Sequence, residues 1–186
     1  NLRVNSPGGS VFAARAMEQA LRAHKGKVVV HIDGLAASAA TFVSMAGDEV
    51  VMAKGAMFMI HKAWTGMWGN AEDLRKEADL LDKIDGTLAE TYADKTGKDI
   101  AAITEWMAAE TWFTAQEALD AGFATSIAEA EAKALAWDLS AYQNAPKAER
   151  QTQPEPATAP EPEPTASDDH RDRQQQRLRL LSLLTA

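Results

Sequence analysis

The chain has 186 residues, a formal net charge of −8 and 46% hydrophobic residues, which suits one folded domain with an appendage. The acidic balance argues against a general nucleic-acid binder, and no apolar run approaches the roughly 20 residues of a membrane span. Because cysteine is absent, disulfides and thiolate metal sites are excluded. With no signal peptide visible, we expect a cytoplasmic protein without nucleic-acid or membrane partners.

The first third of the chain predicts alternating strands and helices. Residues 2–5 are typical of the end of a strand, and Ser6-Pro7-Gly8-Gly9 is typical of a tight turn. Ser10 suits a helix cap, and apolar residues at helical spacing predict a helix over 11–24. A strand over 27–32 follows, so the order is that of a βαβ unit with a parallel sheet. The chain opens inside a strand, which favours a fragment whose earlier strands are missing.

The central stretch is Gly34-Leu35-Ala36-Ala37-Ser38-Ala39-Ala40, where one serine stands among residues almost without side chains. It follows a buried strand, and a helix is expected over 36–46. A serine at such a junction lies near free backbone N–H groups and the positive end of a helix. Small neighbours let a substrate approach closely. The stretch is a plausible setting for a nucleophile, although small-residue helices more often serve tight packing.

The middle of the chain predicts two short strands and a long helix. The strands cover 49–52 and 57–60, and His61 ends the second. Residues 64–69 are rich in glycine and tryptophan and predict a loop or hairpin. The helix over 71–95 has a narrow apolar stripe, which suits a helix that projects from the body or packs on a partner subunit; the stripe consists of Leu74, Ala78, Leu81, Ile84, Leu88 and Tyr92.

The last part of the folded domain predicts short elements. A helix covers 100–109 after Asp99, the capping box Thr114 to Glu117 starts another that ends at Gly122, and 123–127 is a closing strand. We therefore expect one domain over 1–145.

The composition changes at Pro146. Residues 146–167 are rich in proline and glutamate and predict a disordered linker. Residues 168–186 are a candidate for a short amphipathic helix, either a frayed tail or a docking element for a partner.

Catalysis by a hydroxyl needs a base, a group that orients the base, and N–H donors for the oxyanion. Of the four histidines, His61 is the best-placed base because its strand should lie beside the Ser38 helix. His24 ends a helix, His31 alternates along a strand, and His170 lies in the tail.

The oxyanion donors are expected from two backbone positions. A Gly-Gly turn at the carboxyl end of a parallel strand presents N–H groups to the crevice where such sheets bind ligands. The N–H groups of Gly9 and Ala39 are therefore the candidate oxyanion hole, although a lone Ser-Pro-Gly-Gly sequence is more often an ordinary turn.

Four segments together resemble the Clp protease proteolytic subunit, the ClpP family. Each is weak alone, but their order and spacing are similar to those of the family over about residues 1–130. The segments are Val4–Val11 (VNSPGGSV), Gly34–Ala40 (GLAASAA), Met59–His61 (MIH), and Glu110–Ala118 (ETWFTAQEA) with Ala121–Ala124 (AGFA).

The resemblance implies an α/β, crotonase-like fold of repeated ββα units, with its N-terminal part missing here. It also implies a serine endopeptidase that needs no cofactor or metal and acts on protein or peptide substrates. Residue by residue, Ser38 matches the nucleophile, His61 the base, and Gly9 with Ala39 the oxyanion donors. The long helix over 71–95 matches the handle through which heptamer-type homo-oligomeric rings stack in pairs.

The third member of the implied triad departs from the family pattern. Glu110 stands where the family has aspartate, and its extra methylene moves the carboxylate; Glu105 and Asp120 are poorer candidates by position. ClpP-like head maturation proteases of phages often carry this Glu-Thr-Trp pattern and C-terminal extensions, so the sequence favours that branch. Either a Clp ATPase or phage capsid and scaffold proteins would then be partners, and the missing beginning puts the ATPase in doubt.

Three other functions stay open on the sequence alone. A crotonase-type acyl-CoA enzyme would use an oxyanion hole with carboxylate bases. A serine protease with a lysine base, similar to signal peptide peptidase, would use Lys54 or Lys62. A non-enzymatic shell or scaffold subunit would keep the fold and bind through the tail.

Overall fold

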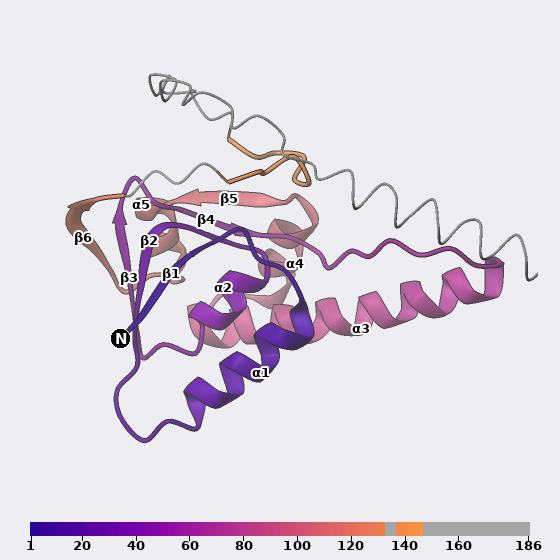
Figure 1. Ribbon diagram of the computed structural model, residues 1–186, viewed down its shortest axis with the longest axis horizontal. Coiled ribbons are helices and arrows are strands. Elements are labelled where there is room, and N and C mark those ends of the chain that lie inside the picture. Colours follow the sequence, from indigo (N-terminus) through magenta and orange to yellow (C-terminus); the bar gives the residue numbers. More distant parts are fainter. Residues whose placement is uncertain (133–136, 147–186) are drawn as a thin grey trace, which may run out of the picture. The chain divides into compact units, whose positions relative to one another are not determined.

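The computed structural model describes residues 1–132 and 137–146, which form an α/β domain (Figure 1). Strands and helices alternate along most of the chain. In chain order the elements are β1 (Leu2–Ser6), α1 (Val11–Arg22), β2 (Val29–Ala37), α2 (Ala39–Ser44), β3 (Glu49–Lys54), β4 (Met57–Ile60), α3 (Ala71–Thr96), α4 (Ile100–Ala108), β5 (Thr111–Thr114), α5 (Ala115–Ala121) and β6 (Ser126–Glu131).

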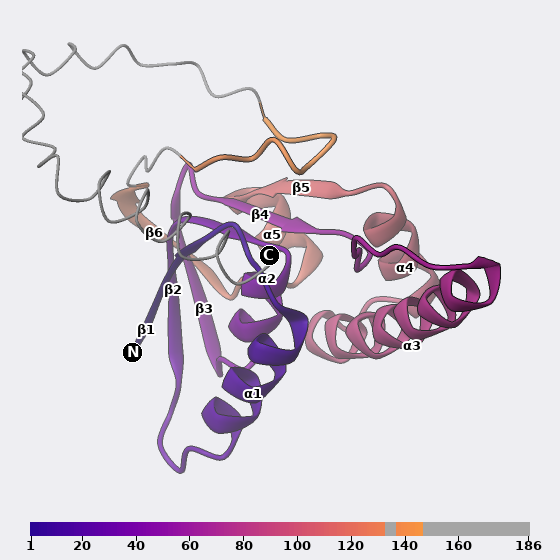
Figure 2. The same cartoon turned by 45° about the vertical axis from the view of Figure 1, so that its right-hand side comes forward.

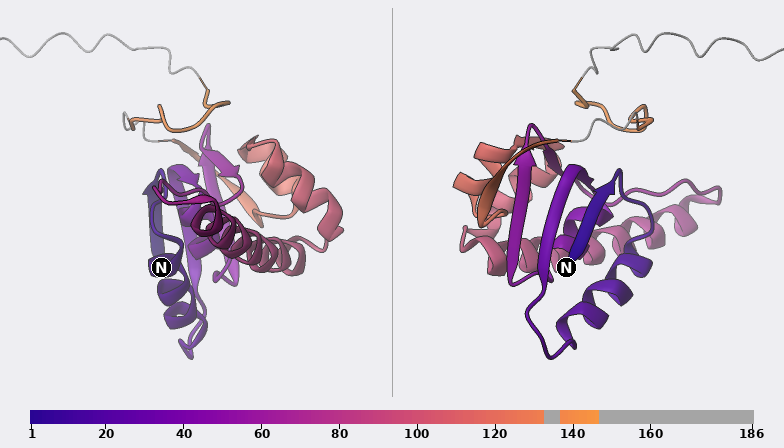
Figure 3. Two further views of the ribbon diagram at one scale, coloured as in Figure 1. Left: turned by 90° about the vertical axis from the view of Figure 1, so that its right-hand side faces the viewer. Right: turned by 60° about the vertical axis from the view of Figure 1, so that its left-hand side comes forward.

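The described strands form one six-stranded sheet around β2. The order is β5-β4-β2-β3-β6, and β1 also pairs with β2. The first half of β2 is parallel to β3, with Val30 opposite Val50, and its second half is parallel to β4, with Ala36 opposite Phe58. Figure 3 shows β1, β2 and β3 side by side. Only β5 breaks the parallel pattern, because it runs antiparallel to β4.

The main core lies between one face of the sheet and the helices. Alternate strand residues such as Ile32, Met52 and Phe58 are fully buried there. Phe58 stacks on Phe123, with ring centroids 4.9 Å apart, and each of the helices α1 to α5 contributes buried residues. This packing fixes α2 against β2 and β4 (Figure 2), and so fixes the junction that carries Ser38.

Helix α3 extends away from the sheet (Figure 1), as the narrow apolar stripe predicts. Its start has a capping box in which the Asn70 side chain accepts from the N–H of Asp73, and Gly97 ends it in the left-handed conformation. Only the second half is anchored, where Leu88 and Tyr92 are buried. Within the described residues, no helix is long and apolar enough to cross a bilayer.

The prediction of a helix over 36–46 was wrong at its start. Strand β2 continues through Asp33 and Gly34 to Ala37, and α2 begins only at Ala39. The alanines pair with β4, and the N–H of Ser38 donates to Met59 O at 2.9 Å. Sheet pairing therefore overrides the high helix propensity of alanine.

The last two strands also differ from the prediction. The closing strand β6 begins at Ser126 rather than at 123, because the N–H groups of Phe123 and Ala124 donate to Ala118 O and close α5. Strand β5 was not predicted. Its residues, Thr-Trp-Phe-Thr, favour strands, but a run of only four residues is a weak signal, and its antiparallel pairing with β4 fixes it in the sheet. The predicted linker, apart from Pro146, and the tail helix lie outside the described residues.

Candidate active site

Ser38 occupies a tight junction between β2 and α2. Its backbone has φ 54° and ψ −127°, a left-handed conformation that costs a non-glycine residue about 1–3 kcal/mol. The Ser38 side chain makes no capping hydrogen bond to α2. The junction therefore leaves the hydroxyl available at the carboxyl end of the parallel strands, where such sheets bind ligands.

His61 lies beside Ser38 because β2 and β4 are parallel and in register. Ala37 is opposite Met59, so the residues that follow these strands leave the sheet at the same edge. His61 Nε2 is 2.7 Å from Ser38 Oγ. The structure thus brings the predicted nucleophile and the predicted base into hydrogen-bonding distance.

The surroundings of His61 favour the neutral imidazole. Burial lowers its pKa below the usual 6.5, and the charge of Glu110 opposes that shift without cancelling it. A neutral imidazole at physiological pH accepts a proton from a hydroxyl, which is what a general base requires.

The glycine turn after β1 packs directly against the nucleophile. Gly8 has φ 102°, and a Cβ atom on it would lie 2.7 Å from both Ala37 O and Ser38 Cβ. Gly9 and Ala39 line one cavity of about 340 Å³ next to this turn. As the first residue of α2, Ala39 has an N–H group without a partner inside the helix. The roles of Gly9 and Ala39 as oxyanion donors stay a prediction.

Glu110 lies close to the pair but is held by other groups. Its carboxylate accepts from the N–H of Asn144 at 2.6 Å, the N–H of Gln143 at 2.9 Å and Trp112 Nε1 at 3.2 Å. Within residues 1–132 and 137–146, no hydrogen bond joins it to His61. Burial on its own raises the pKa of Glu110. These hydrogen bonds and His61 together lower that pKa by more than burial raises it, so the carboxyl group is ionised. Its contribution to His61 is therefore electrostatic.

Replacing Glu110 by glutamine is expected to shift the acid limb of the pH–rate profile to lower pH. The carboxylate charge raises the pKa of His61, so its loss leaves burial unopposed and lowers that pKa further. The measurement is the midpoint of the rate of Ser38 modification against pH. Glu105→Gln, at an exposed position on α4, is the matched control; an equal shift in both variants would contradict the electrostatic role.

A buried hydrogen-bond chain supports the backbone of Ser38, and it was not predicted from the sequence. Thr41 Oγ1 donates to Ser38 O at 2.5 Å, and Tyr92 OH lies 2.8 Å from Thr41 Oγ1. Because the threonine hydroxyl has only one hydrogen, Tyr92 is the donor to Thr41. Complete burial raises the pKa of Tyr92 to about 12, so the phenol stays protonated. In the sequence Tyr92 figured only as one residue of an apolar stripe.

Tyr92→Phe is expected to destabilise the fold by about 1 kcal/mol, the usual cost of removing one partner of a buried hydrogen bond. Urea unfolding measures the change. Thr91→Ala, at a half-buried residue of the same helix turn whose hydroxyl donates to Thr87 O, should change stability less, and a larger effect there would contradict the importance of the buried chain.

The other candidate bases lie elsewhere. Lys54 ends β3 and Lys62 follows His61, and both are exposed; within the described part of the chain, neither ammonium group bonds to Ser38. His31 contacts the Asn1 side chain. Of the poorer candidates for the acid, Glu105 is exposed and Asp120 accepts from Gln116.

Comparisons with known proteins find a matching family and relatives of this chain. The Clp protease family model matches residues 1–131. The chain is 34% identical over 130 residues to the ATP-dependent Clp protease proteolytic subunit 1 of Leifsonia xyli, covering 69% of this chain and 66% of the relative. It is 34% identical over 141 residues to proteolytic subunit 2 of Rhodococcus jostii, covering 72% and 70%. The chain thus spans about two thirds of the length of these relatives.

A solved structure has the same fold. The chain superposes on a ClpP1 mutant from Listeria monocytogenes with a TM-score of 0.63 and 23% identity, covering 68% of this chain and 71% of that one. The ClpP-like fold implied by the sequence motifs is therefore confirmed. With the match over residues 1–131, these findings show that the chain belongs to the Clp protease family.

Proposed function

We propose that this protein is a serine-type endopeptidase. The observation that carries the proposal is the 2.7 Å contact between Ser38 Oγ and His61 Nε2, made at a strained junction beside a neutral imidazole. A crotonase-type enzyme has no use for this pairing, and a scaffold subunit has no need of it. Membership of a family of proteases supports the same conclusion.

The reaction follows from the positions of these groups. Ser38 Oγ attacks the scissile carbonyl carbon while its proton passes to His61 Nε2. The N–H groups of Gly9 and Ala39 stabilise the oxyanion. His61 then protonates the leaving amine, and an acyl-enzyme remains on Ser38. Water attacks that ester by the same route in reverse, and the ionised Glu110 stabilises the imidazolium formed in each step.

The test is covalent labelling of the full chain by a fluorophosphonate, which reacts only with an activated serine. Wild type should be labelled, and Ser38→Ala should lose labelling completely. Ser44→Ala is the matched control, because Ser44 is buried in α2, the helix that follows Ser38, and donates to Ala40 O. This variant should be labelled like wild type. Undiminished labelling of Ser38→Ala would overturn the proposal.

We also propose the substrates, the assembly, the location and the biological role. Protein or peptide substrates and homo-oligomeric rings of heptamer type follow from the family, and α3 offers exposed apolar residues such as Leu74 and Leu80 for stacking the rings. Membership of the family also leads us to propose a cytoplasmic location. The Glu110-Thr111-Trp112 pattern supports a role in phage prohead maturation with capsid or scaffold proteins, rather than with a Clp ATPase. Light scattering of the purified chain tests the ring.

A further inference from the structure

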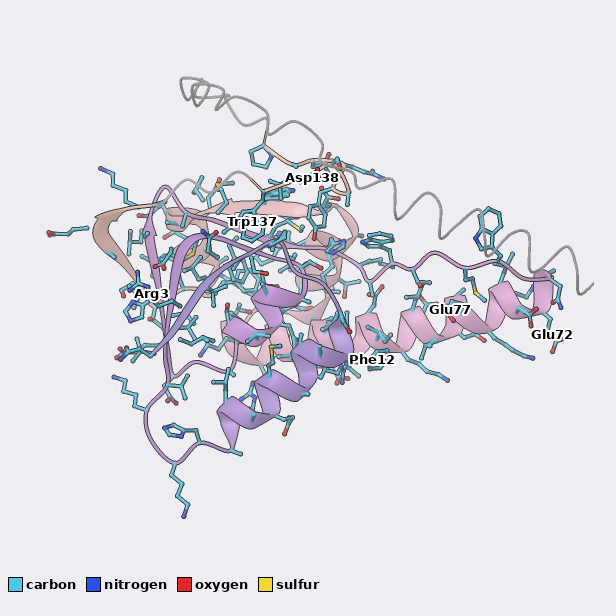
Figure 4. All side chains as sticks on the ribbon, in the orientation of Figure 1. Arg3, Phe12, Glu72, Glu77, Trp137 and Asp138 are labelled. Carbon is cyan, nitrogen blue, oxygen red and sulfur yellow. The ribbon has the colours of Figure 1, made fainter. Side chains whose placement is uncertain are left out.

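Residues 137–146 lie beyond the matched family region, 1–131, yet they contact the catalytic site; we call them the strap. Figure 4 labels Trp137 and Asp138 at its start. Trp137 Nε1 donates to Asn5 Oδ1 at 3.0 Å. At the other end, the N–H groups of Gln143 and Asn144 bond the Glu110 carboxylate. The strap is thus attached to both the glycine-turn side and the acid side of the site.

The strap has an apolar seat on the face of the sheet opposite the main core. Leu35 and Ala37 of β2 and Met59 of β4 form a small buried cluster there. Leu139 and Tyr142 of the strap pack against this cluster, together with Trp112. This seat belongs to the strands that end at Ser38 and His61, so whatever occupies it lies next to the catalytic pair.

Tyr142 bridges the two sides of the catalytic pair. Its ring meets the His61 ring edge-on, with centroids 5.3 Å apart and an angle of 84°. Its hydroxyl donates to Pro7 O, the carbonyl just before Gly8. Burial raises the pKa of Tyr142, and a contact with the Ser38 side chain lowers it in part, so the protonated phenol lies close to the nucleophile itself.

A substrate peptide needs the space and the acceptor that Tyr142 occupies. Its scissile carbonyl has to lie over Ser38 Oγ, between the His61 ring and the glycine turn. Extended peptides bind by pairing their N–H groups with main-chain carbonyls, and Pro7 O, a carbonyl beside the nucleophile, already accepts from Tyr142. The phenol and a bound peptide therefore exclude each other.

We propose that the strap is an autoinhibitory cover, and that a peptide has to displace Tyr142 to reach Ser38. This inference rests on the proposed peptidase function. Because only the open molecules react, the apparent rate is the rate of the open form multiplied by the fraction of molecules whose strap is open. Loosening the strap then speeds every reaction at Ser38, whereas a strap that positioned the catalytic groups would slow it.

The experiment compares rates of fluorophosphonate labelling at Ser38 in the full chain. Tyr142→Ala removes the bridge and should label about tenfold faster than wild type. Tyr142→Phe keeps the ring on its apolar seat, loses the hydroxyl that bonds Pro7 O and contacts the Ser38 side chain, and should label about threefold faster. Phe12→Ala, at an aromatic residue of α1 that is 66% exposed, should label like wild type. A synthetic peptide of residues 137–146, added to the Tyr142→Ala chain, should restore slow labelling.

The outcomes separate the two proposals. If wild type is labelled at Ser38 and both Tyr142 variants are labelled at the same rate or more slowly, the autoinhibitory strap is wrong while the peptidase stands. If Tyr142→Ala fails to fold, Tyr142→Phe alone decides. If no folded chain is labelled, the proposed function fails and the inference falls with it.

Discussion

Gly8→Ala is expected to abolish labelling of Ser38 and to destabilise the fold by about 2–4 kcal/mol. Two effects add at this position. The backbone has φ 102°, which an alanine adopts only with strain, and the new methyl group would lie 2.7 Å from Ala37 O and from Ser38 Cβ. Neither neighbour can move easily, because Ala37 is paired with Met59 and Ser38 is held at its own strained junction.

Fluorophosphonate labelling and urea unfolding of Gly8→Ala measure both effects. The matched control is Gly86→Ala on the exposed side of α3, where an added Cβ meets nothing within 4 Å and the backbone is helical. That substitution should be neutral or stabilising by up to about 1 kcal/mol. Wild-type labelling by Gly8→Ala would show that the turn is not packed against the nucleophile as described.

Elements with strong local signals were predicted closely. Strand β4 has the predicted bounds. Helix α3 begins at the predicted residue, because the Asn70 capping box and the Gly97 cap act within a few residues of the helix ends. The failures are at positions decided by distant partners. Ala36 and Ala37 favour a helix alone but pair with β4, and the four-residue β5 is too short to predict without its partner β4.

The catalytic pair was predictable because each member follows a strand of a parallel sheet, within a motif of fixed order. The supporting groups were not. Tyr92 is 54 residues from Ser38 in the chain, and Tyr142 lies outside every motif, so only the tertiary fold shows that they meet near the nucleophile. Glu110 was selected from the resemblance alone, and its hydrogen bonds to the strap amides carry no sequence signature, because any residue supplies a backbone N–H.

His61→Ala is expected to slow labelling of Ser38 by about a thousandfold, within the usual range for losing a general base. In wild type the rate should fall as the pH drops through the pKa of His61, since only the neutral imidazole accepts the proton. Burial lowers that pKa, so the midpoint should lie below 6.5 and labelling should persist in mildly acidic buffer.

A control variant and a lysine variant complete this test. His24→Ala, in the exposed turn after α1, should keep both the rate and the midpoint of wild type. The lysine alternative is separated by substitution, because Lys62 directly follows His61 and its replacement leaves the imidazole in place. Loss of labelling in Lys62→Ala with full labelling in His61→Ala would therefore move the base to Lys62 and leave the 2.7 Å contact of His61 with Ser38 without a catalytic role.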